Sequence, residues 1–147
     1  MFNRMLVPVD GSEQANRAVD AAVELAHKFA GGILILCVYR HHSPLEASLS
    51  MVRGPGKLDT PDEALHGYAE DLVKEAKDRA IAAGAEQVEA WAKRGHPART
   101  IVAFAENRGA DSIVMGTRGL GDFGGLLMGS VSHKVTSMAK VTVVLVK

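Results

Sequence analysis

This 147-residue sequence has only one cysteine and no excess of charge of either sign. Its single cysteine, Cys37, excludes a disulfide within the chain, which favours a reducing compartment. Its 17 basic residues balance 17 acidic residues, so the net charge gives no support for DNA, RNA or an anionic membrane as the main partner. An anionic ligand would therefore need a site that is built locally, mainly from backbone groups.

Long apolar runs are also missing. No stretch approaches the roughly 18 apolar residues of a membrane span. Pro8 and Asp10 interrupt the N-terminal apolar segment that a signal peptide would need. We therefore expect a cytoplasmic protein without a membrane partner. The length and the 47% apolar content predict one globular domain over residues 1–147.

Short apolar runs alternate with segments of helical period. We predict strands at 4–9, 33–38, 87–93, 112–116 and 141–147. We predict helices from 13 to 29, from about 62 to 84, from 97 to 109 and from about 129 to 139. Most of these strands are apolar on both faces, as in a parallel sheet that helices cover on both sides. The sequence thus predicts an α/β, Rossmann-like fold with a doubly wound open sheet of five strands.

The same patterns predict how the helices begin, end and pack. Ser12 is the expected N-cap of the first helix, Gly31-Gly32 its expected end, and Pro97 the expected first residue of the third. The predicted inward residues of the helix near 62 are Leu65, Tyr68, Leu72, Ala76 and Ala80, and those of the last helix are Val131, Val135 and Met138. Trp91 is expected to pack on the sheet, and residues 39–61 to form a long loop.

GTRGLGDFGGLLMGS, residues 116–130, is the most unusual segment, with six glycines in its first fourteen positions. It follows a predicted strand directly and runs into the start of a helix. Ligands of doubly wound sheets bind at this edge, beyond the carboxyl ends of the strands. Glycines let the backbone approach an anion, and the free N–H groups of a helix start point at it. The segment therefore predicts a phosphate-binding loop, and the alternative is a flexible surface loop.

Two other glycine motifs do not fit this loop. Gly119-x-Gly121-x-x-Gly124 matches the dinucleotide fingerprint as a string of letters. However, no acidic residue follows Asp122 to hold a ribose, and the loop precedes the last helix instead of the first crossover. A P-loop would need a lysine between Gly129 and Ser130.

Gly116, Gly119, Gly129 and Ser130 have the spacing Gly-x2-Gly-x9-Gly-Ser, which resembles the nucleotide-binding branch of the universal stress protein family. VPVDGSE, residues 7–13, resembles the first strand and turn of that family, and residues 94–116 resemble its third crossover. The resemblance covers nearly the whole chain except about 40–60. It implies the strand order 3-2-1-4-5, which would place Asp10 and the glycine loop on the two sides of one crevice.

The resemblance also implies a ligand, an adenine nucleotide, usually ATP, with Mg²⁺ as a candidate companion. It implies that Asp10, beside Pro8 and Val9, lies near the adenine and ribose, and that the backbone of Val38 bonds the adenine. Met115 and Gly116 would approach the ribose and phosphates. The residues implied to hold the phosphates, Ser130 by its hydroxyl and the others by their backbone, are Gly119, Gly129, Ser130 and Val131.

Several of these residues also have simpler interpretations. Asp10 could cap the turn before the first helix, and Ser130 could be only a helix N-cap. Arg118 could pair with phosphate or be solvated. Cys37 is expected to be a small buried hydrophobe and not a redox centre. The adjacent histidines at 41 and 42 are expected to be solvated and not to bind metal.

The expected function is that of a binding module, a small protein that holds ATP and works in stress adaptation. In the implied strand order, the segment 141–147 is an apolar edge strand, and such an edge invites pairing with a second chain. We therefore expect a homodimer joined through it. One alternative is a slow ATPase or self-phosphorylating enzyme, with Asp10, Asp122 and Arg118 as the nearby candidates. The other is a scaffold that acts only through protein contacts.

Overall fold

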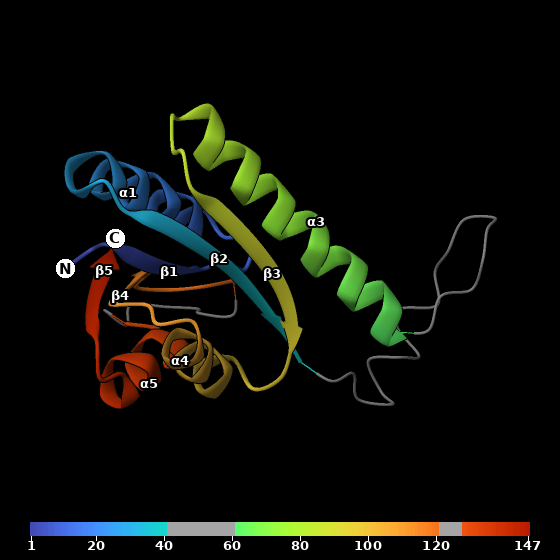
Figure 1. The fold of residues 1–147 in the computed structure, drawn as a ribbon. Helices are drawn as coiled ribbons and strands as arrows, with labels where there is room; N and C mark the ends of the chain where they lie inside the picture. Colours follow the sequence, from blue (N-terminus) through green and yellow to red (C-terminus); the bar gives the residue numbers. More distant parts are fainter. Residues whose placement is uncertain (41–60, 121–127) are drawn as a thin grey trace.

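A five-stranded parallel sheet is the central layer of the computed structural model, which describes residues 1–40, 61–120 and 128–147 (Figure 1). The strands are β1 (Arg4–Pro8), β2 (Gly32–Tyr39), β3 (Val88–Arg94), β4 (Ser112–Gly116) and β5 (Thr142–Val146). Their order across the sheet is β3-β2-β1-β4-β5. The predicted α/β class and the strand order 3-2-1-4-5 are therefore confirmed.

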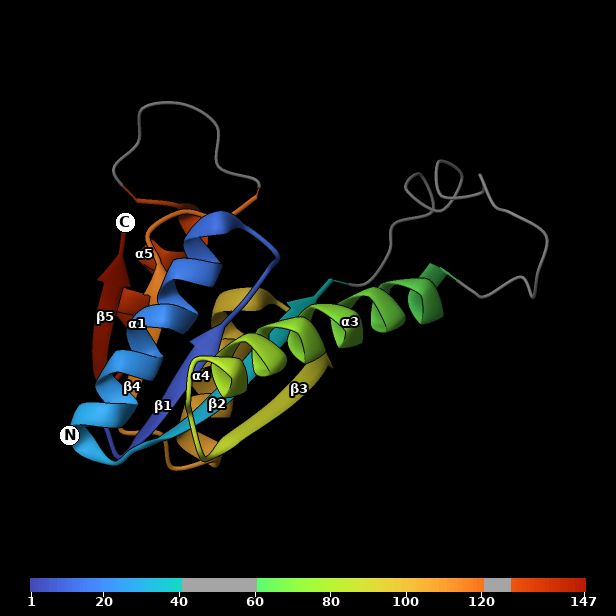
Figure 2. The same ribbon diagram turned by 90° about the horizontal axis from the view of Figure 1, so that it is seen from above.

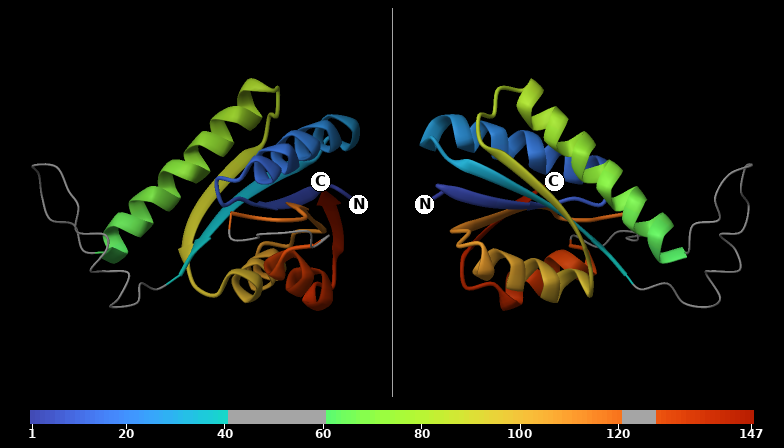
Figure 3. Two further views of the ribbon diagram at one scale, coloured as in Figure 1. Left: turned by 180° about the vertical axis from the view of Figure 1, so that it is seen from behind. Right: turned by 45° about the vertical axis from the view of Figure 1, so that its right-hand side comes forward.

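Helices cover both faces of this sheet. The helices of the described residues are α1 (Glu13–Phe29), α3 (Pro61–Ala82), α4 (Pro97–Asn107) and α5 (Ser130–Met138). Figure 2 looks down on the face where α1 lies over β1 and β4 and α3 lies over β2 and β3. Figure 3 shows that α4 and α5 cover the opposite face. None of the described helices is long and apolar enough to cross a membrane.

Each face of the sheet has its own apolar core. Successive residues of a strand point to opposite faces, so Met5 and Val7 of β1 pack beneath α1 and α3, whereas Leu6 between them packs beneath α4 and α5. All three are fully buried. The same holds for Ile33 and Leu34 of β2, which explains why the central strands are continuous apolar runs in the sequence.

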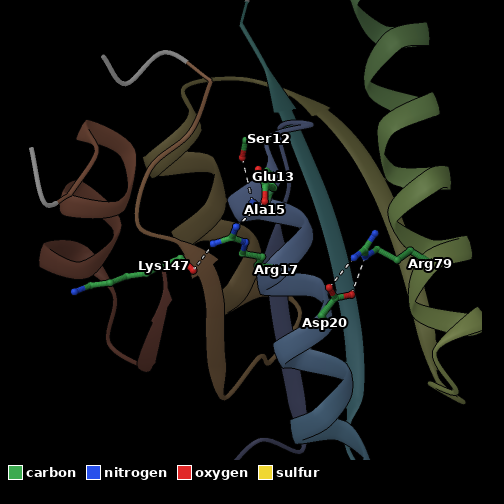
Figure 4. Close-up of polar contacts among 7 residues, drawn as sticks. All are labelled: Ser12, Glu13, Ala15, Arg17, Asp20, Arg79 and Lys147. Carbon is green, nitrogen blue, oxygen red and sulfur yellow. Dashed lines mark hydrogen bonds and ion pairs between the residues drawn. The ribbon is translucent and has the colours of Figure 1, made fainter. Parts of the chain in front are cut away.

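The start of α1 follows the prediction. The Ser12 hydroxyl oxygen accepts a hydrogen bond from the Ala15 amide at 3.1 Å, so Ser12 is the N-cap (Figure 4). Further along α1, Asp20 accepts two hydrogen bonds from the Arg79 guanidinium of α3, at 2.7 and 2.6 Å. This ion pair links α1 to α3, which lie on the same face of the sheet.

The end of α1 follows the prediction in its position, directly before Gly31, but Ala30 takes part in it as well as a glycine. Ala30 takes the left-handed conformation that ends the helix, with φ 53°, and Gly32 already belongs to β2. The Gly31 amide donates to the Ala26 carbonyl oxygen at 3.1 Å, which helps to end the helix. Gly31 also has a second role, because a Cβ atom at this position would lie 2.0 Å from the Phe2 carbonyl oxygen. It allows the chain to pass close to the segment that precedes β1.

Two predicted inward side chains are exposed. Tyr68 of α3 is 58% exposed, because the buried face of that helix consists of the smaller residues Ala69, Val73, Ala76 and Ala80. Met138 is 43% exposed, because it is the last residue of α5 and lies beyond the part of the helix that Val135 anchors. In both cases the helix was predicted correctly and its edge residue was wrongly placed inward.

β5 is an edge strand, as expected. It pairs with β4 from Ser112 opposite Thr142 to Gly116 opposite Val146, and it has no strand on its other side among the described residues. Residues 143–146 are half-buried, which leaves part of their apolar surface accessible.

Candidate functional site

A hollow of about 460 Å³ lies at the carboxyl ends of β1, β2 and β4. Cavities of this size commonly hold small ligands, and this edge is where doubly wound sheets bind them. We call it the first hollow. Nine of the ten predicted site residues line it, namely Pro8, Val9, Asp10, Val38, Met115, Gly116, Gly119, Ser130 and Val131. The sequence thus predicted residues that the fold brings together from four separate segments.

Gly129, the tenth predicted residue, is not in the lining. It is buried, and its amide donates a hydrogen bond of 2.6 Å to the Thr117 carbonyl oxygen. The Ser132 hydroxyl donates to the same carbonyl at 2.6 Å, and the Thr117 amide donates to the Val146 carbonyl at 2.9 Å. These bonds close the base of the glycine loop and fix it to the end of β5.

Ser130 is the first residue of α5, and Gly129 is its N-cap. The interpretation of Ser130 as the N-cap is therefore wrong. No side chain of the described residues caps this helix, and Ser130 is exposed beside the first hollow. The helix start thus presents its positive end and its first amide groups at the hollow.

Asp10 caps the turn before α1, which was the simpler of its two interpretations, and it also contacts the glycine loop. One carboxylate oxygen accepts a hydrogen bond from the Ser12 amide at 2.9 Å, which caps the turn before α1. The other accepts from the Leu120 amide at 3.0 Å, 110 residues further along the chain. Asp10 therefore holds the first part of the glycine loop beside the β1–α1 turn.

Gln14 is a residue that sequence reasoning missed. Its side-chain oxygen accepts hydrogen bonds from the Thr117 hydroxyl at 3.0 Å and from the Arg118 amide at 2.7 Å. The contact is close, because a Cβ atom on Gly116 would lie 2.9 Å from the Gln14 Cβ. Nothing in the sequence marks Gln14, since its partners are more than 100 residues away and glutamine is ordinary in the first turn of a helix.

The remaining candidates have four different outcomes. Cys37 is buried, and its burial, together with the nearby charge of Asp10, raises the pKa of the thiol to about 11, so it stays protonated near neutral pH. Trp91 is half-buried on the sheet, with its ring 5.2 Å from that of Phe104. Arg118 is exposed and lines the first hollow. His41, His42 and Asp122 lie outside the described residues.

The charges around the first hollow are unequal. Arg40 and Arg118 line it. Among the described residues that line it, Asp10 is the one acidic residue, and it already accepts hydrogen bonds from two amides. Within residues 1–40, 61–120 and 128–147, no group of three or more His, Cys, Asp or Glu side chains could hold a metal ion. The lining combines an apolar part, formed by Leu36, Val38 and Ile101, with amides, a hydroxyl and cations on the side of the loop and α5.

Comparison with known proteins identifies the family. The profile of the universal stress protein family matches residues 1–147. The chain belongs to the universal stress protein family.

Individual universal stress proteins match over the full length of the chain. Universal stress protein YxiE of Bacillus subtilis is 34% identical over 154 residues, and the alignment covers 100% of both chains. A Thermus aquaticus universal stress protein, described as lying in the QAH/OAS sulfhydrylase 3′ region, is 37% identical over 149 residues, again with 100% of both covered. Among solved structures, a universal stress protein in complex with cAMP is 30% identical, with a TM-score of 0.70 and coverage of 99% of this chain and 96% of that chain.

Proposed function

We propose that this universal stress protein binds an adenine nucleotide, ATP foremost, in the first hollow, and that it acts as a small regulatory module in stress adaptation. The observation that carries the proposal is the hydrogen bonding of the glycine loop. Asp10 and Gln14 hold residues 117–120 beside the β1–α1 turn, with the hollow between them and α5. The related structure with cAMP supports an adenine nucleotide as the ligand class.

The lining suggests how the parts of the nucleotide are distributed. Adenine fits the apolar part of the hollow, where the end of β2 offers backbone groups at Val38. The ribose would lie beside Asp10 and Gly116. The phosphates would lie at Gly119 and at the uncapped start of α5, where Ser130 offers a hydroxyl and free amides. A Mg²⁺ ion that accompanies ATP would take its ligands mainly from phosphate oxygens and water.

Gly129 has a different part in this proposal from the one that the resemblance implied. Its amide is engaged with Thr117, so it would act by closing the loop and not by contacting phosphate. Each hydrogen bond from an amide to a charged oxygen contributes about 1.5–3 kcal/mol. A few such bonds, less the cost of ordering the ligand, give about 8 kcal/mol, which is a micromolar dissociation constant.

We further propose that the protein is a cytoplasmic homodimer that pairs through β5. The half-buried apolar residues 143–146 on an edge strand support this, because such an edge is available for pairing. A single buried cysteine is compatible with a reducing compartment.

Mass spectrometry of the denatured protein tests nucleotide binding. The purified protein is incubated with ATP and Mg²⁺, passed through a column equilibrated with the same ATP and Mg²⁺ and denatured, and the nucleotide in excess of the column buffer is identified. We expect about one adenine nucleotide per chain. Val38→Phe should abolish retention because it fills the apolar part of the first hollow, whereas Val88→Phe, on a half-buried valine at the other end of the sheet, should retain it. Parent protein that releases no nucleotide would refute the proposal.

A further inference from the structure

A second hollow, also of about 460 Å³, adjoins the first at the N-termini of α4 and α5. Four residues line both hollows, namely Arg40, Pro97, Ser130 and Val131. The two spaces therefore meet at the start of α5, where the phosphates of the proposed nucleotide would lie.

The second hollow is cationic. Arg40, Arg99 and Lys134 line it together with His96, and none of the described residues that line it is acidic. The chain as a whole is neutral, so this charge is concentrated locally. Lys140, which follows α5, pairs with Glu106 at 3.1 Å. None of the ion pairs within the described parts of the chain uses the three cations of the hollow.

Two helix starts add to this positive potential. The N-caps of α4 and α5, His96 and Gly129, make no side-chain capping hydrogen bond. The first turns of both helices contribute lining residues, from Pro97 to Arg99 and from Ser130 to Val131. The positive ends of two helix dipoles thus face one space, together with three cations that form no ion pair with the described residues.

We propose that the second hollow is a phosphate-binding site separate from the cradle formed by the glycine loop. Two guanidinium groups and an ammonium group suit a phosphate chain of several charges better than a single carboxylate, because one carboxylate would balance only one of the three positive charges. The guanidinium groups can form paired hydrogen bonds with phosphate oxygens. The phosphate comes from one of two sources. It is the distal phosphate of a ligand whose base occupies the first hollow, such as a dinucleoside polyphosphate, or it is free inorganic polyphosphate.

The test uses charge removal at two exposed positions outside the first hollow. The variant Arg99→Gln/Lys134→Gln is compared with the parent and with the control Lys28→Gln/Lys77→Gln, which removes the same charge from α1 and α3. Circular dichroism and thermal unfolding check that each variant folds. The affinity of each protein is measured calorimetrically for inorganic tripolyphosphate, adenosine and diadenosine tetraphosphate.

We expect the Arg99/Lys134 variant to lose about tenfold or more in affinity for a phosphate-rich ligand, the size of one charge-assisted hydrogen bond or more. Adenosine affinity should be unchanged, and the control should match the parent throughout. Weakened tripolyphosphate binding indicates free polyphosphate as the source. Weakened binding of diadenosine tetraphosphate alone indicates a ligand that spans both hollows.

Two results would overturn this inference. One is equal affinity of the parent and the Arg99/Lys134 variant for both phosphate-rich ligands, and the other is a parent that binds neither. The proposed function fails separately, when the parent binds neither adenosine nor ATP. Tripolyphosphate binding that depends on Arg99 and Lys134 would then still support the second site.

Discussion

Replacing Gln14 by methionine tests whether the glycine loop is preorganised for its ligand. Methionine has nearly the length and volume of glutamine but no side-chain oxygen that could accept the Thr117 and Arg118 hydrogen bonds. The Arg118 amide is in an exposed contact and can bond to water instead, whereas the Thr117 hydroxyl is in a part-buried one. The net loss is therefore about 1–2 kcal/mol for the two bonds together.

Part of this loss should appear as weaker binding of phosphorylated ligands. If the loop leaves its binding-competent arrangement for part of the time, the apparent dissociation constant rises by the inverse of the remaining fraction. Because Asp10 still holds Leu120, we expect about a three- to tenfold weaker binding of ATP and ADP. Adenosine, which lacks the group that the loop would bind, should lose less than about twofold on the same reasoning.

Calorimetric titration of ATP, ADP and adenosine measures these changes, and thermal unfolding measures the effect on stability. The matched control is Gln87→Met, on an exposed glutamine that precedes β3 at the other end of the sheet. An equal loss for adenosine and ATP would refute the reasoning, because it would indicate general destabilisation. Parent-like ATP affinity of Gln14→Met would also refute it.

Three further predictions concern stability and assembly. Burial raises the pKa of Cys37 from its usual value near 9 to about 11, so the unfolded chain loses this proton before the folded protein does as the pH rises. Between pH 8 and 10, the free energy of unfolding of the parent should therefore fall by about 1.3 kcal/mol relative to that of Cys37→Ala, as measured by denaturant unfolding. The Arg79 hydrogen bond lowers the pKa of Asp20, so the pair stabilises the fold at neutral pH and ceases to do so as the pH falls through that lowered pKa. Arg79→Gln should lower the free energy of unfolding by less than about 1 kcal/mol, because both side chains of the pair are nearly half exposed. In acid and in high salt, denaturant unfolding should give the same free energy for this variant and the parent. Val144→Lys on β5 should convert the proposed dimer to a monomer in light scattering, whereas a parent that is already monomeric at micromolar concentration would contradict the β5 interface.

The fold was predictable where patterns are local. The alternation of short apolar runs with helical segments predicted each described strand and helix, because a sheet that is covered on both faces requires strands such as residues 33–38. Which residues at the edge of a helix are buried was harder to predict. Tyr68 lies beside the buried Ala69, and only the crossing of α3 over the sheet decides which of the two is covered. Met138 is the last residue of α5, and the sequence pattern does not tell where the covered part of that helix ends.

The candidate site was predictable where a motif fixes residue types at set spacings. The spacing of Gly116, Gly119 and Ser130 led to residues that do line the first hollow. Gln14 and Arg99 could not be found in this way, because their importance comes from partners or neighbours that are distant in the sequence. Gly129 was found from its position in the motif, but its role was not, because its amide bonds to the Thr117 carbonyl oxygen and is not free for a phosphate.

Calorimetric titration of ATP into the nucleotide-free protein, with Mg²⁺ present, tests the central claim most directly. The hydrogen-bonded loop and the uncapped start of α5 predict saturable binding of one ATP per chain, with a dissociation constant on the order of micromolar. The same titration into Val38→Phe should give no binding. A parent protein that shows no saturable heat at ATP concentrations up to the millimolar range would contradict the proposed nucleotide site.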